Sequence, residues 1–307
     1  MSESSTALDC LQGLEEFFDY AGQRELRDYL HTITGIEHAD NPLAVLKKLT
    51  LASSALGPEL LNKHLNCYIN LVQGQFDLEQ VVSCARDYEQ HSLLSNIQSF
   101  SKQGFDPLQL NDAFSRSQIR SKIWLITELA KIRTSWRDVA VFAGWFGQLT
   151  ILFRQQLTYH STRIIELDAE ACRASDYVFN LANLVEHKIK SVCADINTLT
   201  LHKNGYEWQV ENFKESTSYT EKFLPDLIIN TSAEHMTEEW FHQLRFKQLD
   251  RDPIVAIQSN NLFDIPEHVN CVHSVDHMKK KFPMREVLFA GELQLKGYKR
   301  VMLIGRP

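Results

Sequence analysis

Long apolar runs are missing from this sequence of 307 residues. No stretch approaches the roughly 18 uninterrupted apolar residues that a membrane-spanning helix needs, and 44% hydrophobic with 23% charged residues is an ordinary composition for a soluble globular protein. The first residues, MSESSTALD, carry acid before any base and lack the apolar segment of a secretory signal. We therefore expect a soluble protein of the cytoplasm.

Closely spaced cysteines are missing as well. The sequence has no CxxC pair, and its six cysteines are spread over the whole chain: Cys10, Cys67, Cys84, Cys172, Cys193 and Cys271. Such spacing argues against a disulfide framework and against a cysteine-based zinc site. It favours reduced cysteines that pack as small buried side chains.

An excess of basic residues is the third absence. Residues 1–115 hold 16 acidic and seven basic side chains, a net charge of −9, and the remaining residues carry +2. The one compact basic run is Lys279, Lys280 and Lys281, which we expect to be a solvated surface. Because nucleic-acid binding relies on a basic field that neutralises phosphates, the composition disfavours RNA and DNA and favours a small-molecule substrate.

The length and the changing pattern along the chain predict two domains. Apolar residues return at spacings of three and four from residue 7 to about 103, and no alternating run precedes residue 138, which indicates a helical bundle. Gly104 and Asp106-Pro107 break this pattern before a new amphipathic stretch starts at Ser115. We therefore predict an all-α domain over 1–114, acting as a lid, a part of the substrate pocket or a homodimer contact, and a second domain over 115–307.

The second domain alternates short β-branched runs with helical stretches, which predicts βαβ units and a parallel sheet flanked by helices. The expected strands are residues 138–144, 161–168, 188–195, 226–232, 253–259, 285–293 and 299–306. The last two strands are separated by only a few residues, too few for a crossover, so we expect them to form an antiparallel hairpin at or near an edge of the sheet.

The segment after the first expected strand, AGWFG, is a candidate ligand turn. Ligands of such sheets bind at the carboxyl ends of the strands, and Gly144 and Gly147 allow a tight turn and a close approach of the backbone. Asp168 follows Gly147 by 21 residues, the separation at which a carboxylate meets the ribose of a bound nucleoside. The alternatives are a plain strand-to-helix corner for the turn and a solvated strand end for Asp168.

Two further strand ends carry candidate ligand contacts. Asp195 ends the third expected strand, where an acid can contact an adenine amino group while Ile196 packs on the ring. The fourth strand ends in a polar cluster: Asn230, Thr231, Ser232, Glu234 and His235. In the alternative interpretation, Ser232 is a helix N-cap and Glu234 an acid of the first helical turn.

These features together resemble the class I, Rossmann-like S-adenosylmethionine-dependent methyltransferases over residues 115–307. The combination VFAGWFGQL, IIELD, DLIINTSAEHM, AIQSNN and YKRVMLIGR is also similar to a group of methyltransferase-like proteins of bacteria and their phages. The resemblance implies a seven-stranded sheet in the order 3-2-1-4-5-7-6 with the last strand antiparallel, and S-adenosyl-L-methionine as cofactor. It implies no acceptor.

The resemblance also implies roles for single residues. Those assigned to the cofactor are Ala143, Gly144, Trp145, Gly147, Asp168, Asp195, Ile196 and Asn230, with the glycines at the methionine part, Asp168 at the ribose, and Asp195 with Ile196 at the adenine. Val141 departs from the pattern because the family usually has an acid there, so the methionyl ammonium would need another acceptor, such as the Ala143 carbonyl. The motif NTSA lacks the prolines of the Asn-Pro-Pro-aromatic motif, which counts against methylation of nucleic-acid bases.

Methyl transfer from a sulfonium requires alignment of the acceptor and, for a protonated acceptor, a base. We expect Asn230 to orient the acceptor and Glu234 or His235 to take the proton, with an N or O atom of a small molecule as the acceptor. The spacings of His235, His268, His273 and His277 do not force convergence, so we expect no metal site. Two alternatives stay open: an aminocarboxypropyl transferase that resembles nicotianamine synthase, and a non-catalytic binding or assembly protein.

Overall fold

The computed structural model describes residues 115–153, 156–178, 189–212, 217–246 and 249–307, and six isolated positions before Ser115. The chain divides into two units, one of which contains residues 108–307. The predicted helical domain of residues 1–114 lies almost wholly outside the described residues, so that prediction and its boundary stay predictions. Within the described part, no helix is long and apolar enough to cross a membrane.

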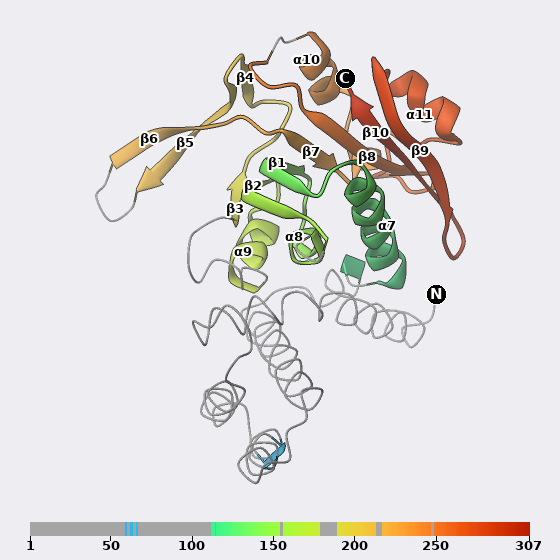
Figure 1. The fold of residues 1–307 in the computed structure, drawn as a ribbon, viewed down its shortest axis with the longest axis horizontal. Helices are drawn as coiled ribbons and strands as arrows, with labels where there is room; N and C mark the ends of the chain where they lie inside the picture. Colours follow the sequence, from blue (N-terminus) through green and yellow to red (C-terminus); the bar gives the residue numbers. More distant parts are fainter. Residues whose placement is uncertain are drawn as a thin grey trace. The chain divides into compact units, whose positions relative to one another are not determined.

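The second part of the chain forms a seven-stranded sheet (Figure 1). Its strands, in order across the sheet, are β3 (Ile189–Cys193), β2 (Thr158–Glu166), β1 (Ser135–Phe142), β7 (Leu227–Asn230), β8 (Ile254–Asn260), β10 (Lys299–Arg306) and β9 (Glu286–Gln294). The neighbours from β3 to β8 pair in parallel, whereas β10 pairs antiparallel with both β8 and β9. The predicted strand order and the predicted terminal hairpin are both confirmed.

Helices cover both faces of this sheet, and Figure 1 shows α7, α8 and α9 on one side with α10 and α11 on the other. Their bounds are α7 (Arg116–Ile132), α8 (Gln148–Phe153), α9 (Ala169–Val178), α10 (Glu239–Phe246) and α11 (Val275–Lys281). Helix α7 begins after Ser115, whose hydroxyl accepts a hydrogen bond from the Gln118 N–H at 3.4 Å, as an N-cap does. Because helices lie on both faces, every residue of β7 and β8 is buried.

A second, smaller sheet was not predicted. Its strands are β4 (Thr200–His202), β5 (Gly205–Asn212) and β6 (Thr217–Phe223), paired antiparallel between β3 and β7 in the sequence. The sequence does contain the pattern of a β-hairpin, because Tyr206, Trp208 and Val210 alternate with polar residues after an Asn-Gly pair at the turn. Tyr206 and Trp208 belong to the main hydrophobic core, which explains why this insertion keeps a fixed place.

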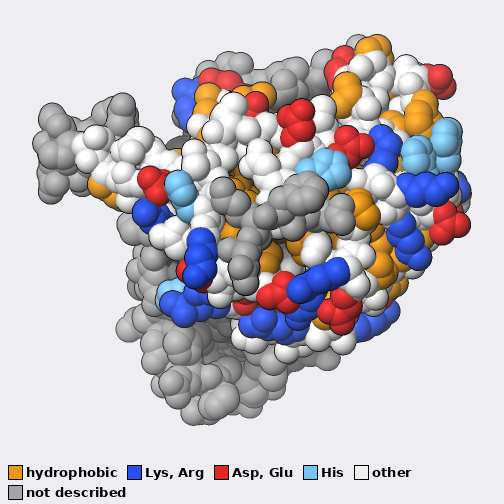
Figure 2. Space-filling view, turned by 90° about the horizontal axis from the view of Figure 1, so that it is seen from above, with side chains coloured by type: hydrophobic (Ala, Val, Ile, Leu, Met, Phe, Trp, Pro, Cys, Tyr) orange, Lys and Arg blue, Asp and Glu red, His pale blue; other side chains and the backbone are white. Residues whose placement is uncertain are grey.

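The surface carries mixed charges. Figure 2 shows Lys and Arg side chains lying next to Asp and Glu side chains over most of the face that it presents. The basic run predicted to be a solvated surface lies in the last turn of α11, where positive charge complements the helix dipole. Among these lysines, Lys281 forms an ion pair with Glu238 at 3.3 Å.

Candidate functional site

The turn that follows β1 has an uncommon backbone. Ala143, Trp145 and Gly147 have positive φ angles of 47°, 48° and 77°, and the residues between them do not. Ala143 and Trp145 carry side chains, so each left-handed conformation costs roughly 1–2 kcal/mol. The N–H groups of all three residues donate within the protein, to the Ile165 carbonyl, the Glu166 carboxylate and the Gly144 carbonyl.

Hydrogen bonds that the turn donates to β2 hold it in its conformation. The Ala143 N–H donates to the Ile165 carbonyl at 2.8 Å, and the Trp145 N–H donates to Oε2 of Glu166 at 2.8 Å. The Trp145 ring stacks on Phe146, with ring centroids 4.9 Å apart. The end of β2 supplies both acceptors. These hydrogen bonds offset the strain in the turn, and they exist because β1 and β2 pair in parallel.

The two glycines of the turn allow close packing. A Cβ atom on Gly144 would lie 2.6 Å from Cγ2 of Ile164, and one on Gly147 would lie 2.4 Å from Oγ of Ser175 on α9. Both separations are too short for a real side chain. These glycines therefore bring the turn against β2 and α9.

The end of β2 carries two carboxylates with different contacts. Strand β2 ends at Glu166, two residues earlier than predicted, and the Glu166 carboxylate braces the turn through the Trp145 N–H. Asp168 lies beyond the strand, where its Oδ1 accepts the N–H groups of Glu170 at 2.8 Å and Ala171 at 3.4 Å. Asp168 is thus the N-cap of α9, and Glu166 is the carboxylate beside the turn.

The two candidate residues after β3, Asp195 and Ile196, lie in different surroundings. Oδ1 of Asp195 accepts the Asn197 N–H at 2.9 Å and closes a short turn. Ile196 is 6% exposed and belongs to the main core cluster. Asp195 is half-buried at the carboxyl edge of the sheet, whereas the side chain of Ile196 packs in the core.

Asn230 ends β7 directly beside Phe142 of β1 and is fully buried. Its Oδ1 accepts the Ser232 N–H at 3.0 Å, and its Nδ2 donates to the sulfur of Met236 at 3.1 Å. The Ser232 hydroxyl in turn donates to the Ala143 carbonyl at 3.3 Å. The loop after β7 is therefore tied to the turn after β1, as their adjacent strands require.

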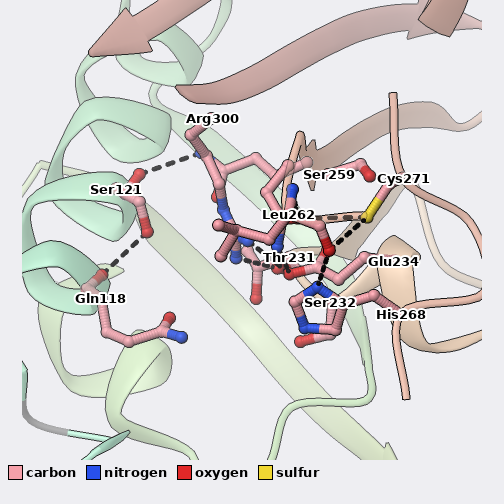
Figure 3. A network of polar contacts seen from close by, with 12 residues as sticks. Gln118, Ser121, Thr231, Ser232, Glu234, Ser259, Leu262, His268, Cys271 and Arg300 are labelled. Atoms are coloured by element: carbon pink, nitrogen blue, oxygen red, sulfur yellow. Dashed lines mark hydrogen bonds and ion pairs between the residues drawn. The ribbon is translucent and has the colours of Figure 1, made fainter. Parts of the chain in front are cut away.

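Glu234 is not an exposed base but half of a buried ion pair (Figure 3). Its side chain and that of Arg300 are both 3% exposed, and Oε1 accepts from Nη1 of Arg300 and from Nδ2 of Asn260, the latter at 2.8 Å. Nη2 of Arg300 also donates to the Thr231 carbonyl at 2.5 Å. A carboxylate held in this way is poorly suited to take a proton from an acceptor, contrary to the role predicted for Glu234.

A buried lysine lies near this pair. Lys122 of α7 donates to Oε1 of Gln118 at 3.0 Å. Burial lowers the pKa of Lys122 to about 7, aided by the positive charge of Arg300 and opposed by Asp112 and Glu234. Neither Lys122 nor Arg300 was identified from the sequence, where each lies close to another basic residue, Arg120 or Lys299.

Two histidines meet at the same edge of the sheet. His235 is exposed and ends the short helix η2 (Ala233–His235), whereas His268 lies in the loop after β8, and their ring centroids are 4.6 Å apart with the rings edge to face. Burial lowers the pKa of His268, against the opposing charge of Glu234. Their sequence spacing did not predict this convergence, which follows from the parallel pairing of β7 with β8. His273 and His277 instead stack on each other, with ring centroids 5.4 Å apart.

Comparisons with known proteins give distant structural likenesses only. No protein-family model matches the sequence, and no curated protein matches it. Among solved structures, N-methyltransferase NodS from Bradyrhizobium japonicum WM9 in complex with S-adenosyl-L-homocysteine is 10% identical, with a TM-score of 0.45 over 68% of this chain and 98% of that one. A SAM-dependent methyltransferase from Leishmania major is 15% identical, with a TM-score of 0.42 over 62% and 82%. Spermidine synthase from Thermotoga maritima is 14% identical, with a TM-score of 0.39 over 61% and 58%.

The order of the seven strands, with antiparallel β10 inserted between β8 and β9, identifies the fold. The chain has the class I methyltransferase fold. In this fold the departure at Val141 has a structural counterpart, because Val141 is 2% exposed and lies between Ile164 of β2 and Ile229 of β7. The position expected to hold an acid is an apolar core position in this chain.

Proposed function

We propose that this chain is an S-adenosyl-L-methionine-dependent methyltransferase that acts on an N or O atom of a small molecule. The observation that carries the proposal is the turn of residues 143–147, whose strained backbone is held by Glu166 at the carboxyl edge of the sheet. Left-handed residues with side chains persist where surrounding contacts enforce them, and they cluster at ligand sites. The same edge is where sheets of this kind bind their ligands.

We assign the ribose of the cofactor to Glu166 in place of Asp168. A carboxylate has about four acceptor positions, and Glu166 uses two of them, for the Trp145 N–H and for the Asp168 N–H at 3.1 Å. Two remain for a pair of ribose hydroxyls. Asp168 is engaged with the first turn of α9, where its Oδ1 accepts the N–H groups of Glu170 and Ala171.

The remaining cofactor contacts follow the strand ends. The backbone from Ala143 to Gly147 would line the methionine part, and Asp195 would meet the adenine. With Val141 in the core, the Ala143 carbonyl is the acceptor that we propose for the methionyl ammonium. This carbonyl accepts one hydrogen bond, from Ser232, and keeps a second lone pair.

On the acceptor side, Asn230 orients the loop more than the acceptor, since its amide contacts lie within that loop. His235 is the exposed candidate that remains, three residues after Ser232, whose hydroxyl contacts the turn. We keep the small-molecule acceptor in the proposal because acidic and basic side chains are interspersed on the visible face, without the uniform basic field that a nucleic acid needs (Figure 2). The helical domain of residues 1–114, its role in a homodimer and the cytoplasmic location stay proposals.

Calorimetry with S-adenosyl-L-methionine tests the proposal. The intact protein should bind one equivalent, and Glu166→Gln should weaken binding by roughly 10- to 100-fold, the value of one or two hydrogen bonds to a charged group. Asp168→Asn is the matched control, and it should bind with unchanged affinity because the asparagine oxygen still caps α9.

The outcomes separate the alternatives. Absence of binding by the intact protein would refute both the methyltransferase and the aminocarboxypropyl transferase. With a reactive acceptor, S-adenosylhomocysteine as product supports methyl transfer, whereas methylthioadenosine supports transfer of the aminocarboxypropyl arm. Binding without turnover on a broad panel of amines, carboxylic acids and alcohols would favour the non-catalytic binding protein.

A further inference from the structure

Three potential metal ligands converge at the carboxyl edge of the sheet. Glu234, His235 and His268 each offer one ligand atom, and these three atoms lie within 4.8 Å of one another. Glu234 and His235 belong to η2 directly after β7, and His268 belongs to the loop after β8. Because β7 and β8 pair in parallel, their carboxyl ends deliver both segments to the same edge of the sheet.

Glu234 presents one carboxylate oxygen without a partner. Its Oε1 accepts from both Arg300 and Asn260, whereas Oε2 is buried and has no hydrogen-bond partner among the described residues. A buried charged acceptor without a hydrogen-bond partner destabilises the folded state. A cation bound at Oε2 would remove this cost, and the two donors on Oε1 already fix the orientation of the carboxylate.

His268 is oriented as a metal ligand is. Its Nδ1 lies 3.1 Å from the Leu262 carbonyl oxygen (Figure 3). A carbonyl only accepts, so Nδ1 carries the proton and the lone pair of the neutral ring lies on Nε2. Metal-ligating histidines commonly donate their other ring N–H to a carbonyl or carboxylate, which fixes the tautomer and the ring orientation.

His235 supplies an exposed third position next to the His268 ring. Two histidines and one carboxylate are a ligand set of catalytic zinc sites, which keep a fourth position open for water or substrate. With metal–ligand bonds of about 2.0–2.1 Å, ligand atoms around one tetrahedral ion lie about 3.3 Å apart. The three ligand atoms lie within 4.8 Å of one another, so binding would draw them together by up to about 1.5 Å.

We propose that Oε2 of Glu234, His235 and Nε2 of His268 bind one divalent transition-metal ion, with Zn²⁺ as the best-matched ion. Imidazole ligands favour Zn²⁺ and its neighbours over Mg²⁺, which prefers oxygen. Arg300 also contacts the Glu234 carboxylate, and its positive charge lowers the affinity of the site for a metal ion. Its contact is to Oε1, whereas the ion would bind Oε2. The metal site stands on these contacts and does not depend on cofactor binding.

A role for the ion in catalysis does rest on the proposed function. The Ser232 hydroxyl, two residues before Glu234, contacts the Ala143 carbonyl of the turn, so the ion would lie on the acceptor side of the cofactor. A ligand in its open position would be an acceptor hydroxyl or amine. The ion would then lower the pKa of that group, the task that the sequence assigned to Glu234 or His235 as a base.

Zn²⁺ binding to the full chain, freed of metal with EDTA and kept reduced, tests the site without any cofactor. Competition with a chromophoric chelator should give one Zn²⁺ per chain, weakened at least 100-fold in both His235→Ala and His268→Ala and unaffected by millimolar Mg²⁺. His160→Ala is the matched control, an exposed histidine near the start of β2 and thus away from the carboxyl edge, and it should leave the affinity unchanged.

Three results would overturn the metal site. The first is no Zn²⁺ binding at all, and the second is a Zn²⁺ affinity that is equal in the intact protein and in both histidine variants. The third is a Co²⁺ derivative with the near-ultraviolet band of a thiolate ligand, which would assign the ion to a cysteine. His235→Ala is the decisive variant because this side chain is exposed and its removal leaves the core intact, as a circular dichroism melt would verify. Metal binding without S-adenosyl-L-methionine binding would refute the proposed function and leave the metal site standing.

Discussion

Replacement of Lys122 by Met should change how the stability of the protein depends on pH. Burial lowers the pKa of this lysine from 10.5 to about 7, so the folded chain binds fewer protons than the unfolded chain between these two values. Where the unfolded state binds more protons, the free energy of unfolding rises with pH. The intact protein should therefore gain stability from pH 7 upward, at about 1.4 kcal/mol per pH unit from this group.

The full shift corresponds to roughly 5 kcal/mol, which is the cost of holding the charged lysine in its buried place below pH 7. Met has a similar length and no charge, so Lys122→Met should be the more stable protein at pH 6.5. This advantage should shrink by about 2–3 kcal/mol between pH 7 and pH 9, as the native lysine becomes neutral.

Urea unfolding at half-unit pH steps from 6.5 to 9, in EDTA, measures this difference. The comparison uses the difference between variant and intact protein, so titrations that both share cancel. Lys131→Met is the control on the same helix, since the Lys131 side chain is 63% exposed and its replacement should give no pH-dependent difference. A Lys122→Met advantage that is constant across this pH range would refute the titration of Lys122 near pH 7.

Three further predictions concern the turn and the helix that follows β2. Ala143→Gly should raise the free energy of unfolding by about 0.5–1 kcal/mol. Glycine removes the left-handed strain, but the greater freedom of the unfolded chain cancels part of that gain. A variant that is less stable than the intact protein in urea unfolding would contradict the positive φ. Gly147→Ala should lower the free energy of unfolding by roughly 2–4 kcal/mol, because a positive φ and an overlap with Ser175 act together. Gly297→Ala separates these two causes, because Gly297 has a positive φ but open space around it. Asp168→Ala should lower the free energy of unfolding by about 1 kcal/mol through loss of the α9 N-cap, and it should leave the calorimetric affinity for S-adenosyl-L-methionine unchanged. A large loss of affinity at unchanged stability would instead assign the ribose to Asp168.

The strands were predictable because their signal is local. Residues 227–229 and 254–257 are apolar and buried, and such short apolar runs between helical stretches indicate the inner strands of a parallel sheet. The hairpin of β9 and β10 followed from a connection too short for a crossover. The small sheet of β4, β5 and β6 was missed although Tyr206, Trp208 and Val210 alternate with polar residues, because the segment lies outside the pattern of strands alternating with helices.

The sequence indicated the edge of the sheet at which the candidate residues lie, but not the contacts that they make. The end of β2 was placed two residues late, at Asp168, because a run of apolar residues followed by an acid does not reveal which carboxylate belongs to the strand and which to the next helix. Glu234 was expected to be a base, yet it pairs with Arg300, 66 residues further along the chain. No local pattern reports a pair between the loop after β7 and the antiparallel strand β10.

The amino-acid order alone determined the class of sheet, the turn after β1 and the gathering of polar residues at the strand ends, because each depends on periodicity or on neighbours within a few residues. Tertiary structure alone decided that Glu166 braces the turn while Asp168 caps α9, that Val141 is a core position, and that Glu234, His235 and His268 meet. These facts depend on which strands pair and in which register, and parallel pairing joins residues that the sequence separates by tens of positions.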